Sequence, residues 1–143
     1  MNIEHNLKLN VTPDVVYNAV STQKGIQGWW CQNSKVGETI GSRTLLSFVK
    51  EGMEIDMGFE TVLLEPNKKV VWQCISMPNP AWIGTRLITE IVESPEGCEV
   101  SFKHADFDRE WEGKPPFEQT KSTWNHFVQS LANYCENGVG QPW

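Results

Sequence analysis

The sequence predicts a single α+β domain in which a curved antiparallel sheet wraps around one long C-terminal helix. Two patterns carry this prediction. Residues 2–11 and 53–64 alternate apolar and polar side chains with a period of two, which is typical of half-buried strands. Residues 117–136 instead place apolar side chains on one helical face, and a helix of this length, about 30 Å, can cover the apolar face of a sheet.

The remaining elements follow from local signals along the chain. After the first strand, Thr12-Pro13-Asp14 has the composition of a helix start with Thr12 as its cap, and a second short helix is expected over residues 22–28. Further strands are expected at residues 43–50, 69–76, 83–93 and 98–107, which brings the sheet to about six or seven strands. Two prolines exclude a central strand over residues 77–82, where an extended loop is expected.

Composition bounds the classes of function. The chain has 143 residues, enough for one domain spanning residues 1–143, and it carries a net charge of −6. Its 12 Lys and Arg residues are scattered, so we expect no nucleic-acid binding. No apolar run approaches the length of a membrane span, and the first ten residues lack the pattern of a signal peptide, so we expect no membrane insertion and a cytoplasmic location.

The motifs that commonly carry catalysis are not evident. The four cysteines are widely spaced without a CxxC pair, so we expect free and mostly buried thiols rather than a metal site. No nucleophile elbow, zinc-protease motif or glycine-rich phosphate loop occurs. We therefore expect no metal and no cofactor, and the sequence assigns no catalytic residue.

Seven tryptophans in so short a chain indicate a large aromatic interior. The apolar side chains of the inward faces either line a cavity between sheet and helix or fill the core completely, and the pattern alone leaves both open. Taken as a cavity lining, the predicted site comprises Trp29, Trp30, Met53, Met57, Phe59, Trp72, Trp82, Thr85, Leu87, Thr89, Phe102, His104, Trp124, Phe127, Val128 and Leu131. Tyr134 is a further candidate for a polar contact.

Several polar residues have a structural and a functional interpretation. By alternation, His104 shares a face with Phe102, where it either contacts a ligand or is a structural residue bonded to a backbone carbonyl or to Asp106. Glu54, Asp56 and Glu60 resemble paired acid–base carboxylates, but spacing by two on an outer strand face is more typical of a solvated surface. Arg43 and Arg86 are candidates to pair with them across the sheet.

The order of elements resembles the SRPBCC/START-like superfamily, in the branch related to the C-terminal domain of the heat-shock-protein-90 ATPase activator. The resemblance rests on LNVTPDVVYNAVSTQKGIQGWW, VVWQCI after EPNKK, SFKHADF and WNHFVQSLANYCENG, and it covers nearly the whole chain. Trp29-Trp30 match a tryptophan that commonly closes the second short helix in this family. His104 matches a histidine that often ends the last strand, and Trp124 matches a tryptophan that is usual in the first half of the long helix. The segment Glu38-Thr39-Ile40-Gly41 replaces the family's Gly-Gly-aromatic strand start. The resemblance implies a helix-grip fold and, in many members, a cavity for a hydrophobic molecule.

Three functions remain open at this point. The first is binding of a small hydrophobic or aromatic molecule in the cavity. The second is a protein-interaction module like the chaperone activator, with residues 106–112 and the tail Trp143 as candidate surfaces. The third is a cavity enzyme of the cyclase, dehydratase or hydrolase type with His104 as acid–base group. Both a monomer and a homodimer are compatible with the sequence, since Trp82, Trp111 and Trp143 are candidates for exposure.

Overall fold

The computed structural model describes residues 1–143 and contains a seven-stranded antiparallel sheet, three α-helices and two short 3-10 helices. The strands are β1 (Ile3–Leu9), β2 (Asn33–Lys35), β3 (Arg43–Lys50), β4 (Met53–Glu65), β5 (Lys69–Ser76), β6 (Arg86–Ser94) and β7 (Gly97–Ala105). The helices are α1 (Pro13–Ser21), α2 (Gln23–Trp29), η1 (Pro80–Trp82), η2 (Arg109–Trp111) and α3 (Pro115–Asn137). This confirms the predicted α+β helix-grip fold, with two short helices after the first strand and one long helix at the end.

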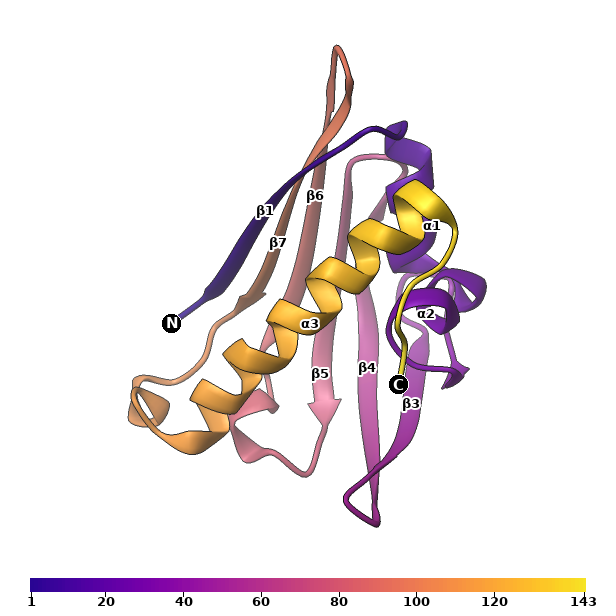
Figure 1. The fold of residues 1–143 in the computed structure, drawn as a ribbon. Coiled ribbons are helices and arrows are strands. Elements are labelled where there is room, and N and C mark those ends of the chain that lie inside the picture. The colour runs from indigo at the N-terminus through magenta and orange to yellow at the C-terminus, as the bar shows by residue number, and fades with distance from the viewer.

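The sheet has the order β1-β7-β6-β5-β4-β3-β2. Strands β2 to β7 therefore follow one another as a meander, while β1 lies at the far edge beside β7, with Ile3 opposite His104 and Leu9 opposite Cys98. Helix α3 runs diagonally across one face of the sheet, and α1 and α2 lie near its C-terminal end (Figure 1). The other face of the sheet has no helix on it.

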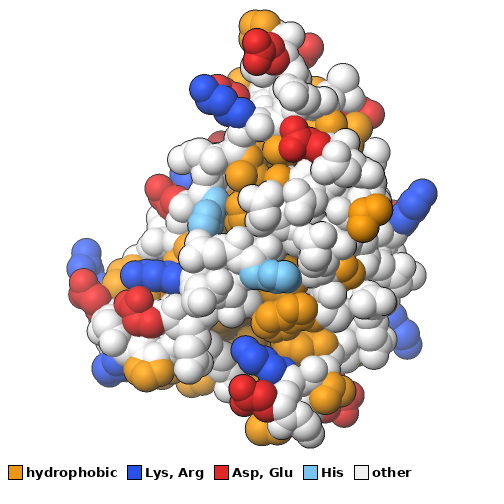
Figure 2. All heavy atoms as spheres, viewed as in Figure 1, with side chains coloured by type: hydrophobic (Ala, Val, Ile, Leu, Met, Phe, Trp, Pro, Cys, Tyr) orange, Lys and Arg blue, Asp and Glu red, His pale blue; other side chains and the backbone are white.

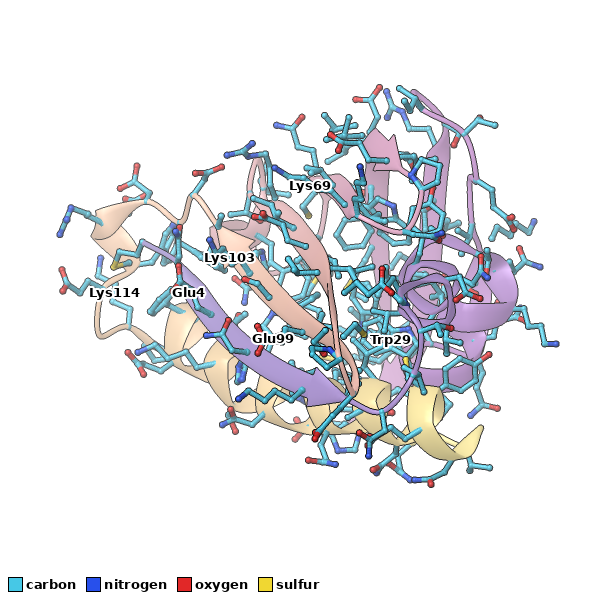
Figure 3. The ribbon with its side chains drawn as sticks, turned by 90° about the horizontal axis from the view of Figure 1, so that it is seen from above. Glu4, Trp29, Lys69, Glu99, Lys103 and Lys114 are labelled. Carbon is cyan, nitrogen blue, oxygen red and sulfur yellow. The ribbon has the colours of Figure 1, made fainter.

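Alternation along the strands separates the two faces of the sheet. In β4, Met57, Phe59 and Thr61 are buried toward α3, and cross-strand neighbours such as Trp72 and Leu87 continue this inner face. Seen from above, α3 lies on one side of the sheet, while side chains such as Lys69 and Lys103 project from the other (Figure 3). The period-two pattern of the sequence thus gives the correct inward face from Met57 to Thr61. A register shift between Thr61 and Leu63 then reverses the faces, so Leu64 rather than Leu63 packs against the core.

Helix starts depart from the prediction in one instructive way. Thr12 occupies the N-cap position of α1 as predicted, but its side chain does not form the capping hydrogen bond that the prediction implied. Thr22 caps α2 instead, because its Oγ1 accepts a hydrogen bond of 3.1 Å from the backbone N–H of Gly25. At the other end of the fold, α3 ends at Asn137 and is followed by Gly138, whose φ of 81° is the left-handed conformation expected of a glycine after a helix.

The outer face carries ordinary surface contacts. Asp56 accepts a 2.7 Å hydrogen bond from Ser47 Oγ, and Arg43 lies opposite Glu60 in the register without an ion pair between them. The predicted pairing of Arg86 with a β4 carboxylate is wrong, because Arg86 Nε donates instead to Asp106 at 2.6 Å.

All four cysteines are buried, and burial raises the pKa of the Cys74 and Cys135 thiols to about 12. No helix combines the length and apolar character that a membrane crossing requires.

Candidate ligand cleft

Aromatic side chains occupy most of the space between the sheet and α3. Trp30 is at their centre, with ring centroids 5.3 Å from Trp124 and 5.6 Å from Phe59. Trp124 in turn packs against Phe102 at 4.8 Å and stacks with Trp82 at 5.9 Å. The interior void beside this cluster has a volume of only about 20 Å³. The middle of the predicted cavity is therefore largely filled by the side chains that were candidates to line it.

The residues around the small void account for a further part of the predicted site. Trp29, Trp72, Leu87 and Thr89 line it together with Trp30 and Phe102. The Trp29 indole N–H donates to the Ala19 carbonyl at 2.7 Å, whereas Trp72 Nε1 is buried without a partner. Phe59, Val128 and Leu131 are buried in the same core and line neither the void nor the larger opening described next. These residues hold sheet and helix together.

The larger opening is a cleft of about 330 Å³ at the end of the sheet where β3 turns into β4. Its walls come from the β3–β4 hairpin, the loop that contains η1, the N-terminal half of α3 and the C-terminal tail. It is lined by Trp30, Phe48, Lys50, Glu51, Met53, Ile55, Met57, Met77, Pro78, Asn79, Trp82, Gln119, Thr120, Thr123, Phe127 and Trp143. Figure 2 shows exposed hydrophobic side chains on the face that α3 crosses, with a basic and an acidic side chain beside them.

Five residues of the predicted site line this cleft: Trp30, Met53, Met57, Trp82 and Phe127. Met53 was assigned to the inward face but is 65% exposed, because it lies at the hairpin end of β4, beyond the part of the sheet that α3 covers. Three of the four methionines, Met53, Met57 and Met77, contribute to the cleft. Methionine side chains are flexible and polarizable, so this wall can adapt to apolar molecules of different shapes.

The loop that carries Trp82 is fixed to α3. The Trp82 indole N–H donates to Thr120 Oγ1 at 2.8 Å, and Asn79 Nδ2 donates to the Pro116 carbonyl at 3.1 Å. Asn79 also accepts a hydrogen bond of 3.0 Å from the Ala81 backbone N–H, which caps η1. The expected exposure of Trp82 is therefore wrong: the ring is 5% exposed and forms one wall of the cleft.

His104 is a structural residue of the core. The Trp124 indole N–H donates to His104 Nδ1 at 2.9 Å, and His104 Nε2 lies 2.7 Å from Thr85 Oγ1, whose hydroxyl donates to the Trp82 carbonyl. Because an indole nitrogen can only donate, the neutral ring carries its proton on Nε2. Neither Asp106 nor a backbone carbonyl is its partner, so that detail of the structural interpretation is wrong. Burial lowers the pKa of His104 to about 3.

This arrangement removes His104 and Thr85 from contact with a molecule in the cleft. His104 is 0% exposed, both ring nitrogens are engaged, and the ring does not line the cleft. Thr85 is likewise buried in this hydrogen-bond chain. Tyr134 packs beside Gly28, at the other end of α3. The titratable side chains that do line the cleft are Lys50 and Glu51, both exposed at its rim.

The tail supplies one cleft residue, Trp143, which the sequence indicated as a candidate interaction surface instead. The Trp143 backbone N–H donates to the Trp30 carbonyl at 2.8 Å, and the Gln32 N–H donates to the Trp143 carbonyl at 2.8 Å. The Trp143 ring then packs against Phe127 at 4.7 Å and Phe48 at 5.1 Å.

Ile55 also lines the cleft although it is not among the predicted site residues. The alternation of β4 could have indicated it, since Ile55 shares the face of Met53 and Met57.

Comparison with known proteins places the chain in a family. The model of the family described as "Activator of Hsp90 ATPase homolog 1-like protein" matches residues 10–136. The chain belongs to this family. The match spans α1 to α3 and therefore includes most elements that form the cleft. Among curated proteins no significant match was found.

Solved structures of family members and related proteins have the same fold. The Aha1 dimer from Colwellia psychrerythraea is 26% identical, with a TM-score of 0.78 over 98% of this chain and 99% of that one. A protein from Staphylococcus saprophyticus is 22% identical, with a TM-score of 0.74 over 99% and 96% of the two chains. DynU16, from the dynemicin biosynthetic locus, is 19% identical, with a TM-score of 0.75; the match covers 97% of this chain and 48% of that one. The last two likenesses show the fold alone.

Proposed function

We propose that this member of the Hsp90-activator-like family binds a small hydrophobic or aromatic molecule in the cleft between the β3–β4 hairpin, η1 and the first turns of α3. The observation that carries the proposal is an apolar cleft of about 330 Å³ beside an otherwise filled interior. Its volume is at the lower end of the range for small-molecule pockets. Its lining joins methionine and aromatic side chains to a few polar groups, among them Asn79, Thr120 and Thr123.

A variant in which a large side chain occupies the cleft tests the proposal. Thr123 projects from α3 into the cleft, whereas its neighbour Ser122 is exposed and does not line it. We expect Thr123→Trp to weaken binding of the neutral probe N-phenyl-1-naphthylamine at least about tenfold by occupying the apolar volume, while Ser122→Trp leaves binding within about twofold. Fluorescence enhancement of the probe measures the affinity, and circular dichroism confirms that both variants fold.

Native mass spectrometry of freshly purified protein supplies a second readout, because a molecule that co-purifies adds its mass to the wild-type protein and should be lost from Thr123→Trp. Equal binding of the probe to both variants would place its site outside the cleft. If the wild-type protein neither binds the probe nor retains any small molecule, the proposal is wrong.

A protein-interaction function is the second candidate, and the family match is the observation that favours it. Of the surfaces considered, Trp111 is partly exposed below the Lys114 ammonium, and Trp143 is 37% exposed at the cleft. The test is the ATPase rate of a purified Hsp90-type chaperone with and without this protein. A rate that rises with added protein, and rises less with Trp111→Ala, would support this function; an unchanged rate at saturating concentration would count against it.

The relative from Colwellia psychrerythraea is a dimer, which makes self-association a related proposal for this chain. Trp82 is buried and cannot supply such an interface, so Trp111 and Trp143 are the remaining candidates among the three tryptophans considered. Sedimentation equilibrium over a range of concentrations distinguishes a monomer from a homodimer.

A further inference from the structure

A second hollow adjoins the cleft, and the two share Phe48, Lys50 and Trp143. The cleft side of this boundary is dominated by methionine and aromatic side chains. The second hollow, of about 520 Å³, is more open, and its lining includes the polar side chains of Gln32, Asn33 and Ser47 beside Val49. The cleft therefore opens directly into a second, shallower hollow, and Lys50 lies where the two meet.

Lys50 has no carboxylate partner in the structure. The three ion pairs join Lys8 to Glu99, Arg86 to Asp106 and Lys121 to Glu118, so none includes Lys50. Its Nζ instead lies 5.1 Å from the centroid of the Trp143 ring. A cation over an indole face is held by the ring quadrupole, and the aliphatic part of the lysine can rest on apolar surface while the ammonium stays in water.

The remaining charge at the rim is Glu51, the next residue in the hairpin. Its φ of 52° is left-handed, which is uncommon for a residue other than glycine, and it forms no ion pair with its neighbour. Lys50 and Glu51 are thus the two charged side chains at the rim of the cleft, and neither of them forms an ion pair.

We propose that the ligand of the cleft is an amphipathic anion, in which an apolar body fills the methionine-rich cleft and a single carboxylate or sulfate pairs with Lys50. This inference rests on the proposed function and specifies the chemical class of the ligand. The apolar body matches the methionine and aromatic side chains of the cleft, and the anionic group matches the Lys50 ammonium at the rim, which has no carboxylate partner. The same cation disfavours a ligand whose polar end is positively charged.

Three ten-carbon compounds that differ in their polar end test the inference: decanoate, decan-1-ol and decylammonium. Their affinities are measured at low salt by quenching of the intrinsic tryptophan fluorescence, since Trp30, Trp82 and Trp143 line the cleft. We expect decanoate to bind about fivefold more tightly than decan-1-ol, and decylammonium more weakly than either, as befits an ion pair at a rim. The preference for decanoate should decline as sodium chloride is added, because salt screens exposed charges.

Two variants with opposite expected effects on decanoate binding extend the test. Lys50→Met keeps an unbranched apolar side chain and removes the charge, so decanoate should lose its advantage while decan-1-ol binds as before. Glu51→Gln removes the competing charge and should strengthen decanoate binding. Lys24→Met is the matched control, because Lys24 is exposed on α2, lines neither hollow, and the substitution changes the net charge equally.

The outcomes separate the two proposals. Equal binding of decanoate and decan-1-ol, unchanged in Lys50→Met, would overturn the anionic ligand and leave the apolar cleft as a binding site. An equal loss of decanoate binding in Lys50→Met and Lys24→Met would attribute the effect to overall charge and would also overturn it. If none of the three compounds binds, the proposed function is itself wrong.

Discussion

Replacement of His104 by alanine is expected to lower the free energy of unfolding by about 3–5 kcal/mol. The imidazole is fully enclosed, and its removal leaves a cavity among Trp82, Phe107 and Trp124. It also leaves the Trp124 indole N–H without its acceptor in the core. Denaturant unfolding followed by tryptophan fluorescence measures the change.

The control for this variant is His126→Ala. His126 is exposed on α3, where its Nε2 lies 3.0 Å from the Gln141 carbonyl, so we expect a loss below about 1 kcal/mol. If His104→Ala does not fold, Trp124→Phe removes only the indole donor and reports on the same hydrogen bond. Unfolding energies for His104→Ala and Trp124→Phe within about 0.5 kcal/mol of the wild type would show that the buried chain contributes little.

The second large effect is a loss of stability in mild acid. In the unfolded chain, His104 takes up a proton below its ordinary pKa of about 6.5, whereas burial lowers its pKa in the folded protein to about 3. Between these values the unfolded state binds more protons, so the free energy of unfolding falls as the pH falls, by up to about 1.4 kcal/mol per pH unit. Between pH 7 and pH 5, His104 alone accounts for about 2 kcal/mol.

The hydrogen bonds of His104 act in the same direction as its burial. Protonation would place a hydrogen on Nδ1, where Trp124 already donates, and would bring two N–H groups together. Denaturant midpoints measured between pH 7.5 and pH 5 test the prediction. In His104→Gln the part of the slope that comes from this residue should disappear, while the contribution of the surface carboxylates is retained. Identical slopes in the two proteins would contradict the assignment.

The fold could be predicted from the sequence because apolar residues recur with the periods of strands and helices. The alternation in β4 gave the correct inward residues from Met57 to Thr61, and the helical spacing of α3 gave most of its buried face, because each pattern lies within one element. Beyond Thr61 a register shift reverses the two faces, which the alternation did not indicate. By contrast, β2 has only three residues, too few for any period to show. The start of β6 at Arg86 depends on η1 and on Gly84 with a φ of 82°, which turn the chain just before it.

The candidate site was harder to predict, since its shape depends on which side chains meet across the fold. The sequence indicated a surplus of tryptophan, but whether Trp124 lines or fills a cavity depends on Trp30, which is far away in the chain. The partners of His104 are 19 and 20 residues distant, and no spacing rule connects them. Trp143 reaches the cleft through backbone hydrogen bonds to residues 30–32, a contact that nothing in the tail's composition indicates.

The position of β1 at the far edge of the sheet also has a consequence for how the chain folds. Strands β2 to β7 pair with neighbours in sequence, but β1 pairs with β7, so Ile3 meets a residue about a hundred positions later. Closing so long a loop is entropically costly and slows folding in proportion to the non-local contacts required. During synthesis β1 leaves the ribosome before β7 and has no partner until β7 has emerged. The helix-grip closes only after β7 has paired with β1 and α3, which follows β7 in the chain, covers the completed sheet.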